Sequence, residues 1–220
     1  MRSKKLELKY VVSALRRTGK DTMKSALVAS MIVATSAALL AQGPPAGGGQ
    51  GRGRGPQTPP LLMTTTAWED GGVIPDKYTQ AAGPDAPSPE LKWSQVPPGT
   101  QSFVLLMHDP EPALNKSSKM DVTHWLVWNI PATSTGLPEG VKTGDQPDGT
   151  KQQSLRSAGY MGPGAPPGPY HHYTFELYAL DTKLDVAPSQ NAGDTRNAVF
   201  AAMDGHVLSK AVLVARFHRQ

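Results

Sequence analysis

The chain has 220 residues, of which 22 are Gly and 21 are Pro, and 18% of its residues are charged and 38% hydrophobic. This length and composition support one ordinary domain with accessory segments and exclude a multidomain assembly. The chain has no cysteine, which excludes a disulfide scaffold, a thiolate metal site and a cysteine nucleophile, so that a metal would have only histidine and carboxylate ligands.

The formal net charge of +4 comes from the first part of the chain. Residues 1–42 contain 8 Lys or Arg and 2 Asp or Glu, whereas residues 43–220 contain 14 and 16, which is a net charge of −2. A nucleic-acid-binding domain carries a basic patch on its folded part. We therefore expect no nucleic-acid partner.

Residues 1–42 have the pattern of a secretory signal peptide. The 16 residues from Ala26 to Ala41 carry no charge, follow Lys20 and Lys24, and include small residues suited to signal peptidase. Met23 and this apolar run form a complete signal, so Met23 is the expected start. A membrane span needs about 20 apolar residues, so this run is short for a membrane anchor. An N-terminal anchor that is retained on the protein is the alternative. We expect a periplasmic or secreted protein after cleavage.

The segment from Gly43 to Pro60 contains 7 Gly and 5 Pro in 18 residues. Such a segment buries too little apolar surface to offset the entropy lost on ordering, so we expect a disordered linker. The folded domain is expected to span residues 61–220.

In residues 61–220, short apolar runs alternate with clusters of turn-forming residues. This pattern indicates a mainly β domain arranged as a sandwich or barrel. One helix is expected over Thr195–Met203, with Asp194 as its N-cap and Gly205 as its stop. The runs expected to form strands are Ser102–Met107, Trp125–Trp128, Tyr173–Leu180 and Val207–Phe217.

Candidate functional side chains lie at the ends of these strands. Asp109 closes one strand and His124 opens the next, so antiparallel pairing would place both at the same end of the sheet. In the following strand, alternation places His171 and Tyr173 on the more apolar face and points His172 outward. A carboxylate near an imidazole raises the pKa of the imidazole, which gives a charged donor for an anion.

The sequence contains few signals of catalysis or metal binding. No Gly-x-Ser-x-Gly motif is present, and the histidines lack the i, i+4 spacing of a metal-binding helix. We therefore expect no metal, no cofactor and no enzymatic activity. The alternatives are a hydrolase using Ser154 or Ser157, a carboxylate pair of Asp109 and Glu111, and a metal triad of Asp109, His124 and His171.

Three motifs follow one another along the domain. They are Asp109-Pro110-Glu111-Pro112, then His124-Trp125-Leu126-Val127-Trp128-Asn129-Ile130-Pro131, then Gly159-Tyr160-x-Gly162-Pro163 with Pro166-Pro167-Gly168 and His171-His172-Tyr173. In order and spacing these motifs resemble the phosphatidylethanolamine-binding protein family and its bacterial Raf-kinase-inhibitor-like branch. The chain departs from the family pattern in a shorter acidic turn and in His172, where Arg is usual.

The resemblance implies a large antiparallel sheet packed on a smaller one, with one short C-terminal helix and a homodimer as in bacterial members. It also implies a small pocket that accepts phosphate or the phosphoethanolamine head group of a phospholipid, lined by Asp109, His124, Pro167, His171 and Tyr173. The implied function is a binding module that regulates or inhibits a partner protein. A hydrolase of phosphate or ester substrates using the same pocket is the alternative.

Overall fold

The computed structural model describes residues 59–114 and 121–220. The expected signal peptide and nearly all of the expected linker lie outside these residues. Within the described part, no helix has the length and apolar character needed to cross a membrane. The elements in chain order are β1 (Leu62–Thr64), β2 (Gly72–Val73), the 3₁₀ helices η1 (Asp76–Tyr78) and η2 (Gln80–Ala82), β3 (Leu91–Ser94), β4 (Ser102–Asp109), η3 (Glu111–Leu114), β5 (Val122–Pro131), β6 (Gly136–Leu137), β7 (Lys151–Gln153), β8 (His171–Leu180), α1 (Ala192–Met203) and β9 (Val207–Phe217).

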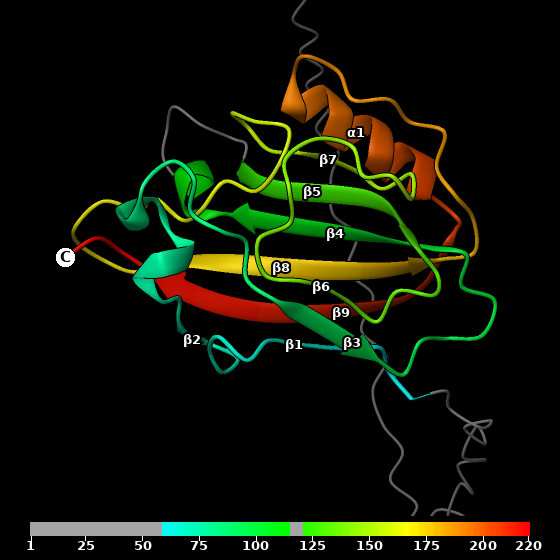
Figure 1. Cartoon of the computed structure of the whole chain (residues 1–220), viewed down its shortest axis with the longest axis horizontal. Helices are drawn as coiled ribbons and strands as arrows, with labels where there is room; N and C mark the ends of the chain where they lie inside the picture. Colours follow the sequence, from blue (N-terminus) through cyan, green and yellow to red (C-terminus); the bar gives the residue numbers. More distant parts are fainter. Residues whose placement is uncertain (1–58, 115–120) are drawn as a thin grey trace, which may run out of the picture. The chain divides into compact units, whose positions relative to one another are not determined.

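The strands form a large sheet and a small sheet (Figure 1). The large sheet has six strands in the order β2-β9-β8-β4-β5-β7, and the small sheet has three in the order β1-β3-β6. Every pairing is antiparallel except the short parallel contact of β2 with β9. The expected mainly β fold, with one sheet packed on a smaller one, is confirmed.

Strands β4 and β5 of the large sheet are buried on both faces, which explains their continuous apolar runs. Leu105 and Met107 of β4 face a core that includes Met63 of β1 and Trp93 of β3, from the small sheet. The intervening Leu106 belongs to a second core on the opposite face, which α1 covers. The domain therefore has three layers, namely small sheet, large sheet and helix.

Helix α1 begins earlier than the sequence indicated. Its N-cap is Asn191, whose side-chain oxygen accepts hydrogen bonds from the backbone N–H groups of Gly193 and Asp194. The expected cap at Asp194 is wrong. This residue lies in the first turn of the helix, where its negative charge interacts favourably with the helix dipole. Val199 and Met203 are buried against the large sheet, as the apolar stripe of the helix predicts.

Candidate functional site

A cavity of about 230 Å³ lies at the end of the large sheet where β4 ends and β5 and β8 begin. Four of the five residues expected at the site line this cavity, namely Asp109, His124, His171 and Tyr173. Its remaining wall comes from η2, from η3 and from the loop between β7 and β8. The antiparallel pairing of β4 with β5 and with β8 brings these strand ends together.

The last residue of β4, Asp109, holds His171 in place. The Asp109 carboxylate is only 4% exposed, and its Oδ2 lies 2.7 Å from Nδ1 of His171. Its other oxygen, Oδ1, accepts the backbone N–H of Glu111 at 3.0 Å. Burial and the neighbouring Glu111 side chain raise the pKa of Asp109 above its ordinary value. Because a carboxylate is an acceptor, the Nδ1 of His171 carries the proton of this hydrogen bond.

The acidic turn adds a second pair of the same kind. Nδ1 of His172 lies 2.7 Å from Oε1 of Glu111. Burial raises the pKa of Glu111, but its bonds with Asp109 and His172 outweigh this effect and leave the pKa below its ordinary value. Asp109, Glu111 and His171 each offer one atom within 4.8 Å of the others, a spacing that could hold a cation. This group differs from the metal triad weighed from the sequence, because Glu111 takes the place of His124.

His124 reaches the cavity through a β-bulge. Met107 of β4 pairs with Trp125 and His108 pairs with Thr123, so His124 is an extra residue on β5. Strict alternation would point His124 away from the face that carries Trp125. The bulge instead turns it to the same side, where its ring packs edge-on against Tyr173 at a centroid distance of 5.1 Å.

The structure contradicts the expectation of a charged His124. The ring is only 4% exposed, and burial lowers the pKa of His124 to about 4. The Asp109 carboxylate binds His171 instead, whereas Nδ1 of His124 lies 2.8 Å from the carbonyl oxygen of Met161. This carbonyl accepts the Nδ1 proton, so the neutral ring has its lone pair on Nε2.

Tyr173 shapes the cavity wall. Its hydroxyl accepts hydrogen bonds from the backbone N–H groups of Gly164 and Ala165, at 3.3 and 3.2 Å. Burial, together with the nearby Asp109 carboxylate, raises the pKa of Tyr173 above its ordinary value, so the hydroxyl stays neutral. These hydrogen bonds hold the Gly- and Pro-rich loop that precedes β8 against that strand.

The structure also corrects the list of expected residues. Pro167 is exposed and does not line the cavity, because the loop presents Pro166 there instead. The cavity wall also contains two long polar side chains outside the expected set, those of Gln80 and Arg156. Gln80 lies in η2 and donates from Nε2 to the carbonyl of Gly162, a contact between segments 82 residues apart that no local pattern signals. Arg156 follows β7 in a loop without a motif.

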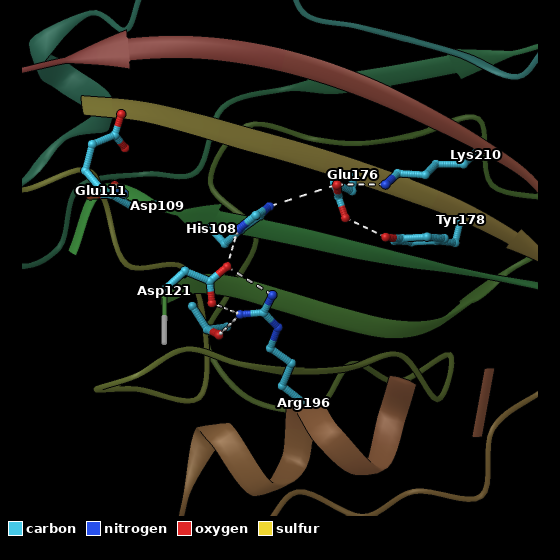
Figure 2. A network of polar contacts seen from close by, with 9 residues as sticks. His108, Asp109, Glu111, Asp121, Glu176, Tyr178, Arg196 and Lys210 are labelled. Carbon is cyan, nitrogen blue, oxygen red and sulfur yellow. Dashed lines mark hydrogen bonds and ion pairs between the residues drawn. The ribbon is translucent and has the colours of Figure 1, made fainter. Parts of the chain in front are cut away.

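The remaining polar side chains near the acidic turn form a network on the other face of the sheet (Figure 2). His108 points away from Asp109, as alternation predicts, and its Nδ1 lies 2.5 Å from Asp121. Arg196 reaches from α1 to the same Asp121 carboxylate, and Glu176 lies 4.0 Å from Nε2 of His108 (Figure 2). This network joins α1 to the large sheet and does not line the cavity.

The chain is similar to known proteins over most of its length. A family model described as phosphatidylethanolamine-binding protein matches residues 64–218. A UPF0098 protein of Methanothermobacter thermautotrophicus is 41% identical over 162 residues, which are 72% of this chain and 99% of that protein. Among solved structures, a homologue of phosphatidylethanolamine-binding protein from Chlamydia trachomatis has 30% identity and a TM-score of 0.57, and Escherichia coli YbcL has 26% identity and a TM-score of 0.61. Each of these two alignments covers 73% of this chain and 99% of the solved chain.

Proposed function

Because the chain belongs to the phosphatidylethanolamine-binding protein family, we propose that its domain binds a small phosphate-like anion, free or as a phospholipid head group. The observation that carries this proposal is the cavity in which the strand ends bring together His124, His171 and Tyr173 around the Asp109 carboxylate. Together with Gln80 and Arg156 in the same wall, these groups supply hydrogen-bond donors and acceptors for a polar ligand.

The two histidines take different roles in this proposal. Nδ1 of His171 is committed to Asp109, so Nε2 is the ring atom of His171 that is left to contact the anion. Arg156, in the same cavity wall, adds a permanent positive charge. His124 is neutral at physiological pH, and its Nε2 lone pair accepts a hydrogen bond from a donor group of the ligand, such as the ammonium of phosphoethanolamine.

The size of the cavity favours a head group over a whole lipid. Pockets for drug-sized ligands measure roughly 300 to 1,000 Å³, whereas this cavity measures about 230 Å³. Phosphate or phosphoethanolamine would be enclosed, and any acyl chains would remain outside.

Calorimetric titration of the full chain with phosphate and phosphoethanolamine at pH 7 tests the proposal. We expect saturable binding that His171→Ala weakens by roughly tenfold or more, because a hydrogen bond to a charged group is lost. His206→Ala is the matched control, since His206 also pairs with an aspartate at 2.7 Å, Asp181, but next to the opposite end of β8. Absence of binding, or equal losses in both variants, would contradict the proposal.

The hydrolase alternative has less support from the geometry. The Ser154 side chain is buried, and its hydroxyl bonds to Ser157, at 2.9 Å between the two Oγ atoms. Within the described part of the chain, neither serine hydroxyl is hydrogen-bonded to a histidine that could activate it. The same purified protein is expected to show no phosphatase or esterase turnover, and saturable turnover abolished by His124→Ala would favour the hydrolase instead.

A further inference from the structure

A second cavity, of about 380 Å³, adjoins the proposed anion site. The two cavities share three wall residues, Gln80, Arg156 and Met161. Gln80 is fixed in this shared wall by its hydrogen bond to the carbonyl of Gly162, at 2.8 Å. The two cavities therefore lie next to each other along this wall, so a ligand in the small cavity lies beside the larger one.

The second cavity is positively charged. Arg156 and Arg219 line it, and no Asp or Glu does. Neither guanidinium group has a hydrogen-bond or ion-pair partner among the described residues. The other arginines of the described ranges, Arg196 and Arg216, both donate to protein oxygens. The two unpaired guanidinium groups thus lie together beside the proposed site.

Both arginines are anchored close to the small cavity. The backbone N–H of Arg219 donates to the carbonyl of Ala165 at 3.1 Å, and Ala165 belongs to the wall of the small cavity. Burial lowers the pKa of His124, and the positive charge of Arg156 lowers this pKa further. The electrostatic field of Arg156 therefore acts inside the small cavity. This positive field extends to the place where the anion is proposed to bind, whereas Arg219 lines only the larger cavity.

We propose that this arginine cavity is a second anion subsite, and that the ligand is a phosphate ester carrying a carboxylate, as in a phosphoserine group. The inference rests on the proposed function, because the phosphate is taken to occupy the small cavity. The carboxylate would lie between Arg156 and Arg219, whose planar guanidinium groups match a carboxylate in geometry and charge. A phosphoserine group occurs both as a free phosphoamino acid and as a lipid head group.

Calorimetric titration of the full chain with O-phosphoserine and phosphoethanolamine tests the subsite, because the two probes differ only in the carboxylate. We expect O-phosphoserine to bind roughly tenfold more tightly. Arg219→Gln should remove this preference and leave the affinity for phosphoethanolamine unchanged, since Arg219 does not line the small cavity. Lys183→Gln, which removes one exposed charge beyond the opposite end of β8, is the control and should keep the preference.

The outcomes separate this inference from the proposed function. Equal affinity for the two probes, or a preference that survives Arg219→Gln, would overturn the subsite while leaving the anion site intact. Failure of phosphoethanolamine and phosphate to bind would overturn the anion site itself. Glycerophosphoserine and glycerophosphoethanolamine distinguish the two sources: a carboxylate preference between these diesters supports a lipid head group, and a preference confined to O-phosphoserine supports a free phosphoamino acid.

Discussion

His124 shows how a single inserted residue creates part of the site. Its position on the β5 bulge buries the ring against Tyr173 and leaves it neutral. A buried neutral histidine has a consequence for stability, because the unfolded chain takes up a proton near pH 6.5 whereas the folded chain does so only near pH 4. The stability that His124 contributes is present above about pH 6.5 and is lost as the pH falls toward 4.

We predict that the free energy of unfolding of the wild type falls by roughly 2 to 3 kcal/mol more than that of His124→Asn between pH 7.5 and pH 4.5. The asparagine amide can still donate to the Met161 carbonyl but does not titrate. Urea unfolding at the two pH values measures the difference. His206→Asn, at an exposed histidine, should behave like the wild type, and parallel pH profiles for wild type and His124→Asn would refute the neutral, buried His124.

At the scale of single residues, the sequence predicted most of the cavity but not its hydrogen bonds. Alternation correctly placed His171 and Tyr173 on one face of β8 and His172 outward. Alternation could not show that Asp109 binds His171 rather than His124. The direction of the His124 side chain is set by the bulge, and the bulge depends on how β4 pairs with β5. Gln80 was missed because tertiary packing alone brings it to the wall.

At the scale of elements, the helix is tied to the sheet by the Asp121 network. Asp121 accepts hydrogen bonds from Arg196 of α1 and from His108 of β4 (Figure 2). Burial raises the pKa of Asp121, but these two partners outweigh that effect and hold the pKa well below its usual range. Its contribution to stability is therefore present above about pH 4, the ordinary aspartate value, and is lost as the pH falls below it.

Asp121→Asn is expected to lower the free energy of unfolding at pH 7 by about 1 to 3 kcal/mol, because it leaves Arg196 and His108 without their charged partner. Thermal or urea unfolding measures this loss, and hydrogen exchange should locate it in α1. The matched control is Asp181→Asn, which breaks an exposed pair with His206 worth about 0 to 1 kcal/mol. Equal losses in the two variants would show that the network does not hold the helix.

The long strands were predictable and the short elements were not. The runs in β4, β5, β8 and β9 stand out because these strands are long and all four lie inside the large sheet, between the edge strands β2 and β7. The small sheet consists of strands of 3, 4 and 2 residues, too short for a period-two pattern to emerge. The start of α1 was placed too late because Gly193 interrupts the helical pattern, although Asn191 is a strong capping residue.

For the whole molecule, we propose that the protein acts in the periplasm or outside the cell after its leader is removed. The apolar run from Ala26 to Ala41 and its flanking lysines support this proposal. The intact mass of the exported protein should correspond to a chain that begins between about Ala37 and Gly43. A protein that retains Met1, or that fractionates entirely with the membrane, would contradict export by a cleaved signal.

The cavity at the strand ends is the proposed binding site. NMR of the histidine side chains tests this most directly. The ring ¹⁵N signals of the full chain are followed during titration with phosphoethanolamine at pH 7. Shifts of the His124 and His171 signals that saturate together are predicted, because both rings line the cavity, while the His206 signal stays unchanged beside Asp181. Saturable binding that leaves the His124 and His171 signals unmoved would place the ligand elsewhere and contradict the account.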